Sequence, residues 1–177
     1  MKFQITIDEK EMYRFNLYHT YHTANGILSI LVGIAVYVVT YLVRSRLQPT
    51  DVILYLIVGT AFLLYYPVSL YMRSKMQIAA SGVLKHPLTY EFKEEGIFVS
   101  SEIDACENDG ETMEGSTNSA LLPWKDVYKI ITNSSQLLIY SSRVNAYVLP
   151  LSQIGEGYDG LKKIISEHVE AFRLHLR

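Results

Sequence analysis

Two long runs without charge constrain this chain more than any other feature of the sequence. Residues 26–43 read GILSILVGIAVYVVTYLV, and residues 52–71 read VILYLIVGTAFLLYYPVSLY. As helices they would measure about 27 Å and about 30 Å, which matches a hydrocarbon core of roughly 30 Å. A core helix of a soluble protein is usually shorter and carries polar residues on one face. We therefore expect two membrane spans, at 26–43 and 52–71.

A short linker, residues 44–51, joins the two runs and contains Pro49, which suits a break between helices. The spans then form a transmembrane hairpin over 26–72, and both chain ends face the same side. Basic residues near the spans indicate which side that is. Three precede the first span, three follow the second and two lie in the linker: Lys2, Lys10, Arg14; Arg73, Lys75, Lys85; Arg44, Arg46. This excess predicts a multi-pass protein of the cell membrane with both termini in the cytoplasm.

The spans have the composition of an anchor. Neither contains Asp, Glu, Lys, Arg or His, and ion or proton pathways usually need such residues. Ser29 and Gly33 form a small-xxx-small pair with Gly26 on the same face, a spacing that lets two helices approach closely. No small-residue cleavage site follows a short apolar core, so we do not expect a cleaved signal peptide.

The hydrophobic pattern changes period after the second span. Residues 73–87 continue as a connector helix that Gly82 and Pro87 end. Apolar and polar residues then alternate, which predicts β-structure. The expected elements are a hairpin at 88–100, strands at 120–124, 126–132, 136–141 and 146–151, and a strand at 2–7 within an N-terminal strand and interfacial segment, 1–25. The acidic stretch 102–118 is interpreted as an exposed loop.

The end of the chain returns to a helical period. One apolar stripe runs through Leu161, Ile164, Ile165, Val169, Phe172 and Leu176, which predicts a helix from about 158 to 177. The expected fold is thus an α+β membrane protein. It consists of the two-helix hairpin and a cytoplasmic domain, 88–177, in which an antiparallel β-barrel or sandwich is closed by a C-terminal helix. Pleckstrin-homology (PH) domains have that order of elements.

Several short motifs carry a resemblance to a known family. They are FQITIDE at 3–9, YRFNLYH at 13–19, YEFKEEGI at 90–97, LPWKDVYKI at 122–130, LLIY at 137–140 and YVLP at 147–150. The chain resembles the bacterial YcxB-like proteins, and the Pro-Trp-Lys-Asp-Val box at 123–127 is the most specific of these motifs. The resemblance implies a bacterial membrane protein of uncharacterised role with two membrane helices and a cytoplasmic PH-like domain. It supplies no catalytic residues.

No residue pattern indicates a catalytic, cofactor or metal site. His19 and His22 share a helix face, but no Cys or carboxylate follows at ligand spacing, so we interpret them as interfacial residues. Trp124 is more consistent with a core position than with ligand stacking. Cys106 lies among carboxylates, which disfavour a thiolate. The acids around Asp109 fail the calcium-loop template.

These observations predict a protein that is not an enzyme and has no cofactor. The net charge of -2 gives no pull toward nucleic acid. We expect a non-enzymatic, membrane-anchored PH-like module that binds a protein or peptide partner at the inner membrane surface, with the lipid bilayer around its hairpin. An immunity or resistance protein against a membrane-active bacteriocin or toxin is an alternative. An accessory subunit of a transporter is a weaker one.

Overall fold

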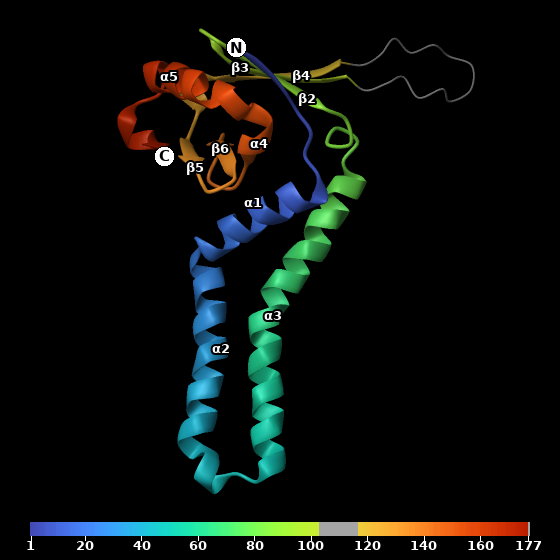
Figure 1. Ribbon diagram of the computed structural model, residues 1–177, viewed down its shortest axis with the longest axis vertical. Coiled ribbons are helices and arrows are strands. Elements are labelled where there is room, and N and C mark those ends of the chain that lie inside the picture. The colour runs from blue at the N-terminus through green and yellow to red at the C-terminus, as the bar shows by residue number, and fades with distance from the viewer. Residues whose placement is uncertain (103–116, 177) are drawn as a thin grey trace, which may run out of the picture. The chain divides into compact units, whose positions relative to one another are not determined.

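The computed structural model describes residues 1–102 and 117–176, with α+β structure in two compact units (Figure 1). One unit contains Met1–Glu11 and Ile78–Arg177, and the other contains Met12–Gln77. The β unit is thus assembled from the chain segments on both sides of the helical unit.

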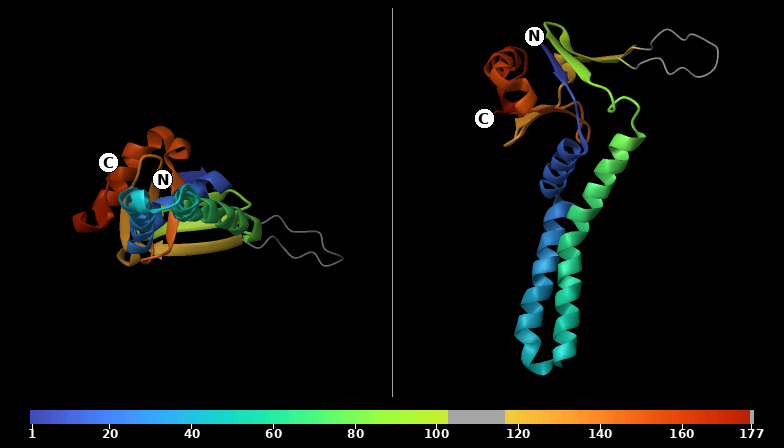
Figure 2. Two further views of the ribbon diagram at one scale, coloured as in Figure 1. Left: turned by 90° about the horizontal axis from the view of Figure 1, so that it is seen from below. Right: turned by 45° about the vertical axis from the view of Figure 1, so that its right-hand side comes forward.

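The helical unit is built from three helices, α1 (Glu9–Tyr21) from Met12 onward, α2 (Ala24–Val43) and α3 (Pro49–Ala80). A short 3-10 turn, Arg44–Arg46, follows α2 and leads into the connection to α3. The two long helices run side by side in opposite directions, as Figure 1 and the right-hand view of Figure 2 show. The helix expected at residues 73–87 is a continuation of α3, which passes through Pro67 and ends at Ala80.

Small residues allow α2 and α3 to approach closely. A Cβ built at Gly33 would lie 2.6 Å from Leu63 Cγ, and one at Gly59 would lie 3.1 Å from a ring carbon of Tyr37. The Tyr37 hydroxyl and Thr60 Oγ1 share a hydrogen bond between the same helices. Of the predicted small face, Gly33 therefore contacts α3. Gly26 instead lies against the end of α1, where an added Cβ would collide with the Thr20 carbonyl.

Within the same unit, α1 is fixed to α3 by polar and aromatic contacts. Asn16 Nδ2 donates hydrogen bonds of 2.8 Å to both Ser74 Oγ and Gln77 Oε1. One turn earlier, the ring of Tyr13 meets the ring of Tyr71 edge-on, with centroids 5.8 Å apart. These contacts position α1 beside the part of α3 where its charge-free run ends.

The first sheet of the β unit has the strand order β1-β2-β3-β4, all antiparallel. Its strands are β1 (Lys2–Ile5), β2 (Leu88–Lys93), β3 (Gly96–Glu102) and β4 (Thr117–Pro123). The expected N-terminal strand therefore pairs with the expected hairpin from across the sequence. Gly96 has a φ of 155°, and a Cβ there would lie 2.8 Å from Pro123 Cα, so the turn requires glycine. Hydrogen bonds from Lys93 and Lys2 hold the pKa of Glu91 below its usual value.

The second sheet has the order β7-β6-β5-β8. Its strands are β5 (Lys129–Thr132), β6 (Gln136–Tyr140), β7 (Ala146–Pro150) and the two-residue β8 (Leu174–His175), which alone pairs parallel. Every residue of β6 is buried. Gln136 Nε2 donates to the Glu11 carbonyl at 2.8 Å and to Glu11 Oε2 at 2.7 Å, which ties the start of α1 to this strand.

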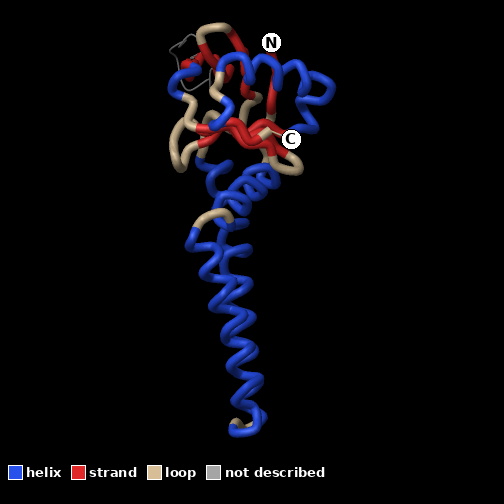
Figure 3. The backbone as a smooth tube through the Cα atoms, turned by 90° about the vertical axis from the view of Figure 1, so that its left-hand side faces the viewer, coloured by secondary structure: helices blue, strands red, loops and turns tan. Residues whose placement is uncertain are grey.

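A common core and one helix join the two sheets, which Figure 3 shows in red. The rings of Tyr90 in β2 and Tyr147 in β7 meet edge-on at 6.2 Å. The helix α5 (Tyr158–His168) contacts β5 through a 2.8 Å hydrogen bond between the Tyr158 and Thr132 hydroxyls. Its other end stacks His168 on Trp124, which follows β4. Of the two arrangements expected from the sequence, barrel or sandwich, the described strands form two four-stranded sheets and no closed barrel.

The prediction of a helix over 158–177 is wrong for the second half of that range. Helix α5 ends at His168, and Val169 is already extended, with φ −118° and ψ 133°. A 3-10 turn at Ala171–Arg173 then leads into β8, whose Leu174 pairs with Ile130 of β5. Strand β8 pairs with the backbone groups on one edge of β5, which would lack this partner if the helix continued. The apolar residues beyond Val169 therefore belong to a different element, although they continue the helical period.

Smaller differences concern strand ends. Trp124 belongs to a 3-10 turn, Trp124–Asp126, so β4 ends at Pro123 and β5 begins at Lys129. Leu151, expected as the last residue of a strand, begins the short helix α4 (Leu151–Ile154). Both changes follow a proline, which lacks the N–H that a strand ladder needs.

The Tyr90 hydroxyl predicts a pH-dependent stability. It is fully buried and has no hydrogen-bond partner among the described residues, so burial, with a smaller contribution from Tyr147, raises the pKa of Tyr90 well above its ordinary value of about 10. Above pH 10 the unfolded chain loses this proton while the folded chain keeps it, so stability falls as pH rises.

We expect Tyr90→Phe to raise the free energy of unfolding by about 1 kcal/mol at pH 7 and to reduce the loss of stability at high pH. Tyr147→Phe is the control. Denaturant unfolding of the full chain in detergent, near neutral pH and above the ordinary tyrosine pKa, measures both, and equal behaviour of the two variants would contradict the assignment.

The contact at Gly33 predicts a steric effect on the hairpin. Gly33→Val would press against Leu63 and destabilise the helix pair by about 1–3 kcal/mol, the usual cost of overpacking. Ala35→Val adds volume at an exposed position of the same helix and should have little effect. Thermal unfolding in detergent, followed by circular dichroism, compares the two. Equal melting temperatures for both variants would show that α2 and α3 do not meet at Gly33.

Candidate functional site

The hairpin surface is the most unusual chemical feature of the chain. More than twenty large apolar side chains of α2 and α3 are exposed, with relative accessibilities between 38% and 70%. Only 17% of the most apolar window of the first helix is buried, and only 6% of that of the second. Both helices are long and apolar enough to cross a membrane. This surface is therefore the first candidate for a functional site.

Exposure of this size is costly in water. Burying one Val, Leu, Ile, Phe or Met side chain is worth about 1.5–3 kcal/mol relative to leaving it exposed. Half-exposure of the nearly twenty such residues on α2 and α3 forgoes about 20 kcal/mol of burial free energy, more than the roughly 5–15 kcal/mol of net stability of a typical domain. A core helix of a soluble protein is mostly buried, and these helices are not. The surface requires an apolar environment.

Amphipathic residues stand at both ends of the hairpin. At the turn after α2, the Arg44 guanidinium lies 4.2 Å from the centroid of the Tyr41 ring. At the opposite end, α1 contributes the Tyr13 contact to Tyr71 and further aromatic residues, Phe15, Tyr18 and Tyr21. Tyrosine and arginine suit the boundary between apolar and aqueous surroundings, because each has an apolar body and a polar end.

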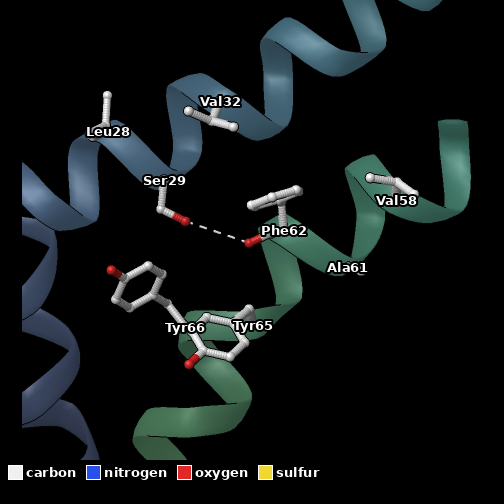
Figure 4. Close-up of a pocket in the computed structure, with 8 residues that line it drawn as sticks. All are labelled: Leu28, Ser29, Val32, Val58, Ala61, Phe62, Tyr65 and Tyr66. Carbon is white, nitrogen blue, oxygen red and sulfur yellow. Dashed lines mark hydrogen bonds between the residues drawn. The ribbon is translucent and has the colours of Figure 1, made fainter.

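A groove runs between α2 and α3 near the start of α2 (Figure 4). It has a volume of about 570 Å³. From α2 it is lined by Leu28, Ser29 and Val32, and from α3 by Val58, Ala61, Phe62, Tyr65 and Tyr66. Ser29 Oγ donates to the Phe62 carbonyl at 3.5 Å, the long bond drawn in Figure 4. The lining contains no charged group, so the groove suits an apolar chain.

The β unit carries a second exposed feature, which we call the aromatic patch: Tyr128, Lys129, Phe172 and Arg173. Tyr128 is 46% exposed and Phe172 is 73% exposed. Arg173 Nη1 donates to the Val127 carbonyl at 3.0 Å, which brings the two segments together beside the β5–β8 pairing. Arg173 lies 5.4 Å from the Phe172 ring centroid, and Lys129 lies 6.0 Å from that of Tyr128. The patch combines solvent-exposed rings with cations.

The residues that the sequence analysis considered for chemistry are engaged in packing. Trp124 is 7% exposed, donates from Nε1 to the Lys93 carbonyl at 2.8 Å and stacks on His168 at 5.0 Å. The His22 ring is tilted against that of Tyr18, with centroids 4.0 Å apart, and the His19 ring stacks on that of Phe15 at 6.0 Å. These contacts give each ring a structural partner.

The acidic residues of the expected loop lie largely outside the described part of the chain. Cys106 and Asp109, together with the other acids between 103 and 116, belong to the residues for which no placement is described. Among residues 1–102 and 117–176, no group of three or more His, Cys, Asp or Glu side chains is arranged to hold a metal ion. The ends of the expected loop 102–118 belong to strands, because β3 extends to Glu102 and β4 begins at Thr117. For 103–116 the interpretation as an exposed loop, and that of Cys106 as an inert thiol, stay predictions.

Comparison with known families gives one match. Residues 106–165 match the family model described as YcxB-like protein. The YcxB-like match covers the Pro-Trp-Lys-Asp-Val box, the strands from β4 to β7 and α5 as far as Ile165. It confirms the family resemblance over these residues, which include the motifs at 122–130, 137–140 and 147–150. No curated protein and no solved structure matches the chain.

The aromatic patch is not predicted by the sequence pattern. The helical period places Phe172 on the buried stripe of a long helix, whereas it is the most exposed large apolar residue among those described in the β unit. The same pattern assigns its neighbour Tyr128 to a strand and says nothing of its exposure. The exposed positions of Phe172 and Tyr128 lie beside the parallel pairing of β8 with β5. That pairing is a contact between distant residues, which the hydrophobic period does not encode.

Proposed function

We propose that the chain is a non-enzymatic, membrane-anchored module. In it, the hairpin α2–α3 spans the cell membrane, and the β unit, a PH-like domain, binds a protein partner at the inner surface. The observation that carries the proposal is the exposed apolar surface of the hairpin. A lipid bilayer supplies the environment that this surface requires, and helices satisfy their own backbone hydrogen bonds within it.

The strand pairing supports a hairpin with both ends on one side. Strand β1 precedes the helical unit and β2 follows it, yet their backbones pair from Lys2↔Glu91 to Ile5↔Leu88. Two segments that pair in one sheet must emerge on the same side of a membrane. The excess of basic residues outside the linker favours the cytoplasm as that side.

The β unit supports a PH-like domain through its order of elements. Two mainly antiparallel sheets of four strands pack around one core, and α5 contacts both through Tyr158 and His168. The hairpin turn between β2 and β3 carries Glu94 and Glu95 beside Lys93. That acidity disfavours anionic headgroups at the turn where many PH domains bind them, so we assign this domain a protein partner.

The aromatic patch is the surface that suits such a partner. Protein interfaces are enriched in Tyr, Phe and Arg, and their strongest contacts often come from aromatic residues and arginine. The patch presents Tyr128, Phe172 and Arg173 together. Attachment to a membrane raises the effective concentration of a partner in the same membrane without any further contact.

Cysteine labelling tests the topology. In a Cys106→Ser background, a linker variant carries Ser45→Cys, and a domain variant carries Val144→Cys in an exposed turn of the β unit. We expect a membrane-impermeant maleimide to label the linker variant in intact cells, and to label the domain variant only after permeabilisation. Labelling in the reverse order would invert the topology, and labelling of both variants in intact cells would rule out a spanning hairpin.

Capture from detergent-solubilised native membranes tests the partner surface. We expect Phe172→Ser and Tyr128→Ser each to reduce recovery of a co-purifying protein by about tenfold, the effect of removing one strong interface contact. Val144→Ser is the matched control, because Val144 is 65% exposed and lies in another turn. Equal recovery with all three variants would exclude the aromatic patch as the binding surface.

A further inference from the structure

A second groove lies along the outer face of α3. Its lining runs from Ala61 and Leu64 through Val68 and Ser69 to Met72, Arg73 and Met76, and its volume is about 730 Å³. Tyr65 and Ala61 line both this groove and the one in Figure 4, so the two apolar hollows meet there. The groove is therefore an open, mainly apolar strip along one helix, with a single cationic residue in its lining.

The polarity of the lining changes in a definite order along the helix. Arg73 is the first charged residue after the charge-free run that begins at Val52, so it lies about 30 Å along the helix from the start of that run. That distance corresponds to the thickness of the hydrocarbon core. Ser69 lies one turn before Arg73 on the same face, and the residues deeper in the groove are apolar. The order is cation, hydroxyl, then hydrocarbon.

The Arg73 guanidinium is available for a ligand. Within the described part of the chain, no ion pair or hydrogen bond is made by the Arg73 side chain. Asn16 and Tyr13 of α1 contact a different set of α3 residues, Tyr71, Ser74 and Gln77. Met72 and Met76, which flank Arg73, are 61% and 62% exposed. Within the helical unit, this face of α3 is therefore open.

We propose that this groove binds one anionic phospholipid of the surrounding membrane. The phosphate accepts hydrogen bonds from the Arg73 guanidinium, which presents a fork of donors suited to phosphate oxygens. Ser69 lies at the depth of the glycerol ester, where its hydroxyl can donate to an ester carbonyl. An acyl chain follows Val68, Tyr65 and Ala61. An apolar helix would satisfy the apolar part of the groove but would leave the arginine without a counterion, so charge complementarity favours the lipid.

This inference depends on the proposed membrane hairpin, and its test separates the two. Full-length protein in dodecyl maltoside micelles is titrated with dioleoyl phosphatidylglycerol or with dioleoyl phosphatidylcholine, which have identical acyl chains. Native mass spectrometry counts the bound lipids, and the melting temperature is followed in parallel. The variants are Arg73→Gln, with Lys75→Gln as a control that removes a neighbouring charge outside the groove lining, and Ser69→Phe, with Val38→Phe as a control that adds the same ring on α2.

We expect the wild-type chain to retain one phosphatidylglycerol in preference to phosphatidylcholine and to melt at a higher temperature with it. Arg73→Gln should weaken this retention roughly tenfold or more, as loss of one charge-assisted hydrogen bond does, and Ser69→Phe should block it. Both controls should bind as the wild type does. Equal binding of the two lipids, or equal loss in Arg73→Gln and Lys75→Gln, would overturn the lipid site and leave the hairpin intact. Protein that needs no detergent to stay in solution would overturn the hairpin itself.

Discussion

The apolar surface of α2 and α3 is the constraint on which the rest of this structure depends. The two helices use small residues, Gly33 and Gly59, for their mutual contact, and that contact covers only a narrow face of each. Most of the remaining Ile, Leu, Val and Phe side chains are exposed. Leaving a surface of this kind in water forgoes more burial free energy than the net stability of an ordinary domain. The proposed membrane anchor and the proposed lipid site both rest on covering this surface with lipid.

The connectivity of the β unit fits that requirement. The hairpin is inserted in the chain between two strands that pair with each other, β1 and β2. The pairing of β1 with β2 holds together the chain segments that precede and follow the hairpin. The hydrogen bonds from Gln136 to Glu11 add a second link near the start of α1. Folding of the β unit therefore depends on chain segments from both sides of the hairpin.

Much of the architecture can be predicted from the sequence, because it is encoded by local period and charge. The uncharged runs predict the two long helices, and alternation predicts the β2–β3 hairpin and the strand that pairs with it from residue 2. The rest depends on contacts between distant residues. Leu174 lies in the stretch whose apolar period predicts a helix but pairs with Ile130, and the exposure of Phe172 follows from that pairing. The groove at Arg73 is equally hidden, because a linear sequence does not reveal which helix face stays uncovered.

Extraction of cell membranes at alkaline pH tests the central claim most directly. Cells producing the full-length chain are broken, the membranes are washed with sodium carbonate without detergent, and the protein is located by ultracentrifugation. A chain anchored by α2 and α3 stays in the pellet through the wash and enters the supernatant only when detergent is added. Release into the supernatant by carbonate alone would contradict a spanning hairpin, and the exposed apolar surface would then need another cover.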